Sequence, residues 1–181
     1  HEDGLSEVNF FIITVPTPIN SAKVPDISAL KQASKLVGRH LYNGQTVVYE
    51  STVYPGVTQD ICIPILEKTS NLKLVKCDSL AENGFYVGYS PERINPGDNS
   101  YKLENIVKVV SGCTPNSSEL IANVYREICN AGVHMAPSIK VAEAAKIIEN
   151  TQRDLNIALF NELSIIFNKL GLDSKQIFDA A

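Results

Sequence analysis

The 181-residue sequence lacks the features that mark several large classes of protein. No apolar run approaches the length of about 18 residues that a membrane-spanning helix needs. No signal-peptide pattern is visible, so the sequence predicts a cytoplasmic protein without a membrane partner. It also lacks a run dense in Lys and Arg, and its formal net charge is −4. This charge balance argues against nucleic acid as a partner.

Cysteine and histidine are too few and too scattered to indicate a disulfide framework or a metal site. The three histidines neither lie close together nor pair with cysteines, and no two cysteines have CxxC spacing. We therefore expect no metal, and we expect the cysteines to be reduced and mostly buried as small apolar residues. The cysteines are Cys62, Cys77, Cys113 and Cys129.

Apolar runs alternate with helical patterns along most of the chain, without an internal repeat. Continuous apolar runs are typical of strands that are covered on both faces. The expected strands are 8–15, 45–49, 85–89, 106–110 and 133–135, and the expected helices are 27–41, 57–68, 114–129 and 138–170, with Asp26 capping the first helix. This alternation predicts an α/β fold with a largely parallel, doubly wound sheet.

Three of the expected strands end in polar or proline-marked turns. The turns read VPTP, ESTVYPG and YSPERINPG, and they contain Thr17, Thr52 and Glu92. Each turn alone is equally well explained by ordinary turn chemistry. In a doubly wound sheet, however, ligands bind at the carboxyl ends of the strands. The convergence of the three turns at one edge favours a ligand site there.

The stretch 138–170 contains neither Gly nor Pro and predicts one long helix. Lys146, Asn150 and Arg153 follow i, i+4, i+7 spacing, so they project from one face. Apolar residues occupy much of the remaining surface, so the helix must be covered on more than one side. We therefore expect it to lie between two layers or two subunits, with one polar stripe for a ligand.

The three turns, together with VAEAAKIIENTQRDLNIALFNEL, resemble the UDP-glucose/GDP-mannose dehydrogenase family over about residues 8–181. SPERINPG followed by this helix is most similar to the bacterial UDP-N-acetylhexosamine 6-dehydrogenases (GlcNAc, GalNAc or ManNAc; Vi-antigen type) of capsule and O-antigen polysaccharide synthesis. The resemblance implies that 1–137 is the later part of a Rossmann-like NAD-binding domain. It implies that 138–170 is a central helix used in homodimerisation and that 171–181 begins the following region.

The resemblance also implies a reaction, in which the C6 alcohol of a UDP-sugar is oxidised to a carboxylate in two hydride transfers to NAD. In the family a cysteine traps the aldehyde as a thiohemiacetal, which the second hydride transfer oxidises to a thioester, and the thioester is then hydrolysed. The sequence contains neither the family's GxGxxG turn nor the Gly-Gly-x-Cys segment that holds this nucleophile. We therefore expect the chain to be part of a longer enzyme, and not to catalyse the reaction alone.

Three sets of residues match functional positions of the family. The matches to catalytic positions are Lys146, Asn150, Thr52 and Glu92; those to cofactor contacts are Val15, Pro16, Thr17, Thr52 and Glu92; those to substrate contacts are Arg93, Ile94, Lys146, Asn150 and Arg153. Lys146 is expected to stabilise an alkoxide-like oxygen and to exchange protons with it. The glucose-type enzymes have a second glutamate where this chain has Pro96, so a mechanism with two glutamates does not carry over.

Simpler interpretations stay open for several of these features. Judged by spacing alone, Lys146 could be a surface lysine, and Arg153 could form an ion pair with Glu149 or Asp154. The long helix could serve only as a dimerisation module in a catalytically inactive chain. A β-hydroxyacid-type dehydrogenase also combines a Rossmann domain with a long helix that bears Lys and Asn one turn apart, although the SPERINPG turn speaks against it.

Overall fold

A computed structural model describes residues 2–78, 83–93 and 103–181. The described strands are β1 (Phe10–Ile13), β2 (Thr46–Tyr49), β3 (Lys73–Leu74), β4 (Gly84–Tyr89), β5 (Lys108–Gly112) and β6 (Val133–Met135). The α-helices are α1 (Ser28–Arg39), α2 (Ile63–Ser70), α3 (Pro115–Arg126), α4 (Ile139–Lys169) and α5 (Ser174–Ala180). Short 3-10 helices cover Glu2–Glu7 (η1) and Leu103–Asn105 (η3), and a π-helix, η2 (Thr58–Cys62), leads into α2. The chain divides into two compact units, His1–Ala145 and Lys146–Ala181.

The sheet of the first unit has the order β1-β2-β4-β5-β6, and β3 pairs with β4 off this path. β1, β2 and β4 run parallel, with Phe10 opposite Thr46 and Thr46 opposite Tyr86. β5 is antiparallel to β4, and β6 is parallel to β5. The predicted α/β fold with a largely parallel sheet is therefore confirmed. The short strand β3 was not foreseen.

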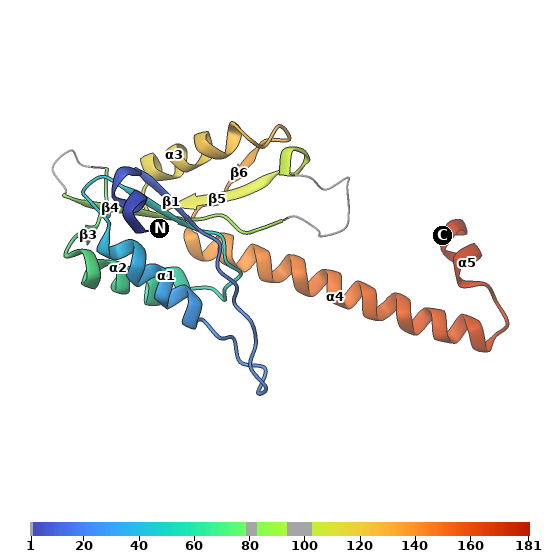
Figure 1. Cartoon of the computed structure of the whole chain (residues 1–181). Helices are drawn as coiled ribbons and strands as arrows, with labels where there is room; N and C mark the ends of the chain where they lie inside the picture. Colours follow the sequence, from blue (N-terminus) through green and yellow to red (C-terminus); the bar gives the residue numbers. More distant parts are fainter. Residues whose placement is uncertain (1, 79–82, 94–102) are drawn as a thin grey trace. The chain divides into compact units, whose positions relative to one another are not determined.

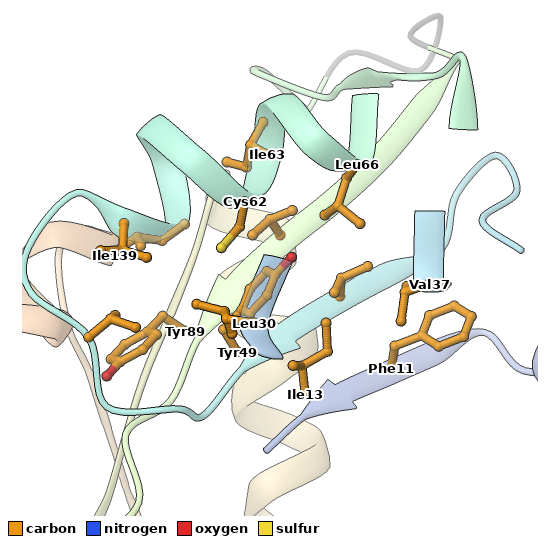
Figure 2. Packing of buried hydrophobic residues seen from close by; sticks show 14 of the residues in the cluster. Phe11, Ile13, Leu30, Val37, Tyr49, Cys62, Ile63, Leu66, Tyr89 and Ile139 are labelled. Atoms are coloured by element: carbon orange, nitrogen blue, oxygen red, sulfur yellow. The ribbon is translucent and has the colours of Figure 1, made fainter. Parts of the chain in front are cut away.

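Side chains alternate between the two faces of the sheet, so each strand supplies two cores. Val47 and Tyr49 of β2 pack into the larger cluster, with residues of α1, η2, α2 and the start of α4. Figure 2 shows this packing, in which Leu30, Cys62, Leu66 and Ile139 surround the strand residues. Val48 points the other way, into a smaller cluster with Ile121 and Tyr125 of α3. Helices thus cover both faces of the sheet, as Figure 1 shows.

The starts of two helices differ in how their orphan N–H groups are satisfied. At α3, Thr114 is the N-cap and forms a reciprocal capping box with Ser117. At α1, the prediction that Asp26 is the cap is wrong. The N-cap is Ile27, which has no side-chain cap, although Asp26 Oδ1 accepts a hydrogen bond from the Ser28 N–H at 2.9 Å. Asp26 thus bonds to the first residue of the helix from one position before the N-cap.

The second unit consists of most of α4, followed by α5. Its apolar residues are widely exposed, including Ile148 (68%), Leu155 (63%) and Ile165 (51%). Phe178 of α5 packs edge-on against Phe160 and Phe167 of α4, with ring centroids 5.0 Å and 5.9 Å apart. α5 therefore folds back onto the end of α4.

Candidate functional site

The carboxyl ends of the three parallel strands β1, β2 and β4 meet at a small pocket of about 240 Å³. All of its walls come from the turns that follow these strands, which is where α/β sheets bind ligands. The residues that line it are Thr14, Val15, Pro16, Thr17, Glu50, Ser51, Thr52 and Glu92. Seven of these eight residues carry a polar backbone N–H, and six carry a hydroxyl or a carboxylate, so the pocket can hydrogen-bond a polar ligand on several sides.

Hydrogen bonds between the turns hold the pocket in shape. The Thr17 hydroxyl donates to the Thr52 carbonyl oxygen, and the Ser51 hydroxyl donates to the Val15 carbonyl oxygen, both at 2.6 Å. From β4, the Tyr89 hydroxyl donates to the Ser51 carbonyl oxygen at 3.2 Å. Burial raises the pKa of Tyr89, so its hydroxyl stays protonated and keeps donating. The turns after β1 and β2 are thus joined directly and supported by β4.

The five residues that match cofactor contacts all line this one pocket. They come from three chain segments and are Val15, Pro16, Thr17, Thr52 and Glu92. Arg93 follows Glu92 directly and is half-buried, whereas Ile94 lies outside the described residues. The structure therefore brings together the three turns that the sequence placed at one sheet edge. The role of each residue stays a prediction.

The polar stripe of the long helix lies in the second unit. Lys146 is 8% exposed and Asn150 is half-buried. Arg153 is exposed; its guanidinium contacts Glu149 Oε1 at 2.8 Å and donates to Asn150 Oδ1 at 3.3 Å. The ion pair between Arg153 and Glu149, which the spacing left open, therefore forms in the structure. Lys146 is too little exposed to be the surface lysine of the simpler interpretation.

Sequence reasoning missed the carboxylate of Glu50, which lines the pocket beside Thr52. Its Oε1 lies 3.2 Å from Nζ of Lys108 on β5 and accepts a hydrogen bond from the Tyr125 hydroxyl of α3. The sequence held one signal for this network. Lys108 is a single charged residue inside the apolar run IVKVV, and a charge inside a buried strand requires a partner.

Sequence reasoning also missed Glu143, which lies on α4 within the first unit and is fully buried. Its two carboxylate oxygens accept hydrogen bonds from the backbone N–H groups of Gly56 (2.6 Å) and Thr58 (3.0 Å). These groups lie at the start of η2, where a negative charge is favoured by the unpaired N–H groups of a helix N-terminus. Glu143 thereby fastens the first turns of α4 to the segment that follows Thr52.

Comparison with known proteins identifies the family. Residues 1–129 match the UDP-glucose/GDP-mannose dehydrogenase family, NAD binding domain, and residues 140–181 match the central domain of the same family. The chain belongs to the UDP-glucose/GDP-mannose dehydrogenase family. The match of the first region to an NAD binding domain confirms the expected cofactor, NAD. The membership also sets aside the β-hydroxyacid-type alternative.

Several relatives in this dehydrogenase family match the chain over nearly its whole length. A UDP-N-acetyl-D-glucosamine 6-dehydrogenase of Pseudomonas aeruginosa is 55% identical over 98% of the chain, and one of Salmonella typhi is 56% identical over 99%. The solved structure of a UDP-D-ManNAc dehydrogenase from Pyrococcus horikoshii is 30% identical, covers 100% of the chain and superimposes with a TM-score of 0.87. The chain spans about 40% of the length of these relatives.

Three of the four cysteines of the chain lack the properties of a reactive thiol. Burial raises the pKa of Cys62 to about 11, and it also raises the pKa values of Cys113 and Cys129. A thiol with a raised pKa forms little of the thiolate that attacks carbonyl carbon. Cys77 is exposed and lies outside a Gly-Gly-x-Cys segment. Within the described ranges, no group of three metal-binding side chains gathers, and no helix is long and apolar enough to cross a membrane.

Proposed function

We propose that this chain is part of an NAD-dependent UDP-N-acetylhexosamine 6-dehydrogenase, which oxidises the C6 alcohol of its substrate to a carboxylate. The pocket at the carboxyl ends of β1, β2 and β4 carries the proposal, because it gathers Thr17, Thr52 and Glu92 in a region that matches an NAD binding domain. The identities of 55% and 56% to two UDP-N-acetyl-D-glucosamine 6-dehydrogenases support the substrate class. The resemblance of SPERINPG and the long helix to enzymes of capsule and O-antigen polysaccharide synthesis extends the proposal to that process, and Protein CapL of Staphylococcus aureus is 53% identical to the chain.

The pocket suits one end of a dinucleotide such as NAD. Its volume of about 240 Å³ is smaller than a whole drug-sized ligand site, so it takes a part of the cofactor and not all of it. Thr17 and Thr52 supply hydroxyls, and Val15 and Pro16 supply an apolar wall. NAD bound there supplies the acceptor for the hydride. In our proposal Thr52 and Glu92 lie closest to the reacting sugar, where Glu92 activates a water or transfers a proton.

The polar stripe of α4 contributes the groups that handle the substrate. We assign Lys146 to the proton exchange and charge stabilisation at the sugar C6 oxygen, with Asn150 one turn along as a hydrogen-bond partner. Arg153 contacts the nucleotide-sugar, because a guanidinium can hold phosphate or carboxylate oxygens with two hydrogen bonds. In this proposal the contact replaces or accompanies the Glu149 ion pair. Arg93 and Ile94 complete the substrate contacts.

The domain layout follows from the same proposal. Residues 1–137 form the later part of the NAD-binding domain, 138–170 the central helix, and 171–181 the start of the next region. Exposed apolar residues on α4, such as Leu155 and Ile157, support a homodimer through this helix. We place the protein in the cytoplasm, where the NAD and UDP-sugar pools are.

Turnover of the full-length protein tests the proposal. We expect NADH to form when the protein is mixed with NAD+ and UDP-N-acetylglucosamine, or with its galacto or manno epimer, and we expect two NADH for each uronic acid formed. UDP-glucose and GDP-mannose serve as comparison substrates, and a mixture without sugar gives the background. A protein that forms no NADH with any UDP- or GDP-sugar would contradict the proposal.

Sedimentation of the full-length protein tests the homodimer. Leu155→Glu places a charge on the exposed apolar surface of α4, whereas Asn168→Glu places it at an exposed polar position of the same helix. We expect the first variant to shift the protein toward monomer and the second to remain dimeric. A wild-type protein that sediments as a monomer would rule out the helix as a dimer interface.

A further inference from the structure

Lys108 is a fully buried lysine and the first residue of β5. Two residues further along β5, Val110 points to the same face and belongs to the apolar cluster under α3. An ammonium group at such a site is strongly disfavoured unless a negative partner and hydrogen bonds compensate for the lost water. A negative partner is therefore needed more at this position than at a surface lysine.

The partner is Glu50, which directly follows β2 on the same face of the sheet. Nζ of Lys108 lies 3.2 Å from Oε1 of Glu50 and 5.2 Å from the centroid of the Tyr125 ring. The Tyr125 hydroxyl donates to the same oxygen, Oε1. Burial and the adjacent Glu50 carboxylate raise the pKa of Tyr125, so this hydroxyl remains a donor. Two donors, one from β5 and one from α3, thus hold the same oxygen of Glu50.

The other side of Glu50 belongs to the pocket. The side chain is 11% exposed, and it lines the pocket together with Thr17, Thr52 and Glu92. Lys108 and Tyr125 both use Oε1, so Oε2 is the oxygen that they leave to the pocket. A carboxylate that is clamped at one oxygen presents the other as a hydrogen-bond acceptor in a defined direction.

Building on the proposed function, we propose that Glu50 binds the cofactor by accepting a hydrogen bond from its nicotinamide-riboside end, and that Lys108 and Tyr125 are positioning residues for this carboxylate. The donors available at that end of NAD are the carboxamide NH2 and the ribose hydroxyls. Each of these groups is a neutral donor that can form a hydrogen bond to the charged Glu50 carboxylate. The pocket is too small for the whole dinucleotide, which fits recognition of one end.

Binding of NAD+ to the full-length protein, measured by isothermal titration calorimetry, tests this inference. Glu50→Gln keeps the size of the side chain but removes its charge, and we expect the Kd for NAD+ to rise about 10-fold or more. Glu119→Gln is the matched control, because Glu119 pairs with Arg126 on the exposed surface of α3. We expect this control to bind NAD+ as the wild type does.

A double-mutant cycle tests whether Lys108 acts through Glu50. Lys108→Met alone should weaken NAD+ binding, whereas Glu50→Gln combined with Lys108→Met should bind no more weakly than Glu50→Gln. The double variant also removes the unpaired buried ammonium that Glu50→Gln alone would leave, so it keeps the test valid if the single variant unfolds. A double variant that folds and binds NAD+ with wild-type affinity would overturn the inference. Additive losses would overturn the positioning role of Lys108.

A cofactor analogue identifies the donor. 3-Acetylpyridine adenine dinucleotide has no carboxamide NH2 but keeps both ribose hydroxyls. Equal affinity of the wild type and Glu50→Gln for this analogue supports the carboxamide as the donor, and a persistent loss supports a ribose hydroxyl. Wild-type protein that does not bind NAD+ at all would contradict the proposed function itself. Wild-type binding that Glu50→Gln leaves unchanged would contradict only the role of Glu50.

Discussion

Lys146 combines low exposure with a position on the polar stripe of α4. In the proposed enzyme it exchanges a proton with the sugar oxygen. General acid–base catalysis of this kind typically raises a rate by about 100-fold or more. We therefore expect Lys146→Ala to lower kcat by at least about 100-fold while the melting temperature stays near that of the wild type. Steady-state kinetics and a thermal melt of the full-length protein measure the two quantities.

Lys140→Ala is the control for this variant. Lys140 lies on the same helix, and its side chain is 53% exposed. Its Nζ lies 3.7 Å from Oδ2 of Asp60. A surface ion pair of this kind contributes little to stability, so we expect this variant to keep normal kinetics. A near-normal rate in Lys146→Ala would show that Lys146 has no part in the mechanism.

At the scale of single residues, the sequence predicted those pocket residues that stand out in a turn after a strand. Thr17, Thr52 and Glu92 could be placed together because parallel strands end at one edge of the sheet. Glu50 lies in one of these turns as well, but nothing within the turn marks it as a functional residue. What distinguishes it is the bond to Tyr125, a residue 75 positions away, and periodicity does not reveal which distant residues meet.

At the scale of elements, Glu143 connects α4 to the start of η2. Glu143→Ala leaves the buried N–H groups of Gly56 and Thr58 without their acceptors. Losing two hydrogen bonds to a charged acceptor should lower the free energy of unfolding by about 3 kcal/mol. Urea denaturation of the chain measures this change, and faster hydrogen exchange at Gly56 and Thr58 locates it.

Two comparison variants sharpen the result for Glu143. Glu143→Gln keeps one carbonyl acceptor of the same size, so we expect it to lose less stability than Glu143→Ala. Glu162→Ala removes an exposed glutamate of the same helix and should change the free energy of unfolding by no more than about 0.5 kcal/mol. If Glu143→Ala were as stable as Glu162→Ala, the connection between α4 and η2 would carry no energetic weight.

The positions of the elements were predictable because apolar runs and helical periodicity are local signals. Expected strands at 45–49, 85–89 and 106–110 correspond to β2, β4 and β5. The antiparallel direction of β5 was not predictable, since a strand buried on both faces has the same apolar run in either direction. β3 has only two residues, which is too short for any alternation to be seen.

At the scale of the whole molecule, the first unit buries several tyrosine hydroxyls and cysteine thiols in the hydrophobic cores on the two faces of its sheet. Burial raises the pKa of Cys62 to about 11 from an ordinary value near 9, and it raises the pKa of Tyr49 well above its usual range. Tyr49 and Cys62 lie side by side in the larger cluster, where the Tyr49 hydroxyl also shares a hydrogen bond of 2.8 Å with Ser34. Both groups are neutral when protonated, so the folded state favours the protonated form.

These shifts predict that alkali destabilises the fold. Below about pH 9 both the folded and the unfolded chain hold the Cys62 proton, so its contribution to stability is fully present. As the pH rises from about 9 to 11, the unfolded chain releases this proton while the folded chain retains it, and the free energy of unfolding falls. Two pKa units correspond to about 3 kcal/mol for this one thiol. Tyr49 continues the decline at higher pH, because its unfolded pKa lies near 10.

Urea denaturation of the 181-residue chain at a series of pH values from 7 to 11 measures this decline. Cys62→Ala removes the ionising group, so its unfolding free energy should start lower, because of the cavity, but fall less steeply with pH than that of the wild type. Tyr42→Phe, at a tyrosine that is 56% exposed, should follow the slope of the wild type. Equal slopes in Cys62→Ala and the wild type would show that the folded chain releases the Cys62 proton as easily as the unfolded chain does, which a thiol enclosed by Tyr49, Leu30 and Leu66 should not do.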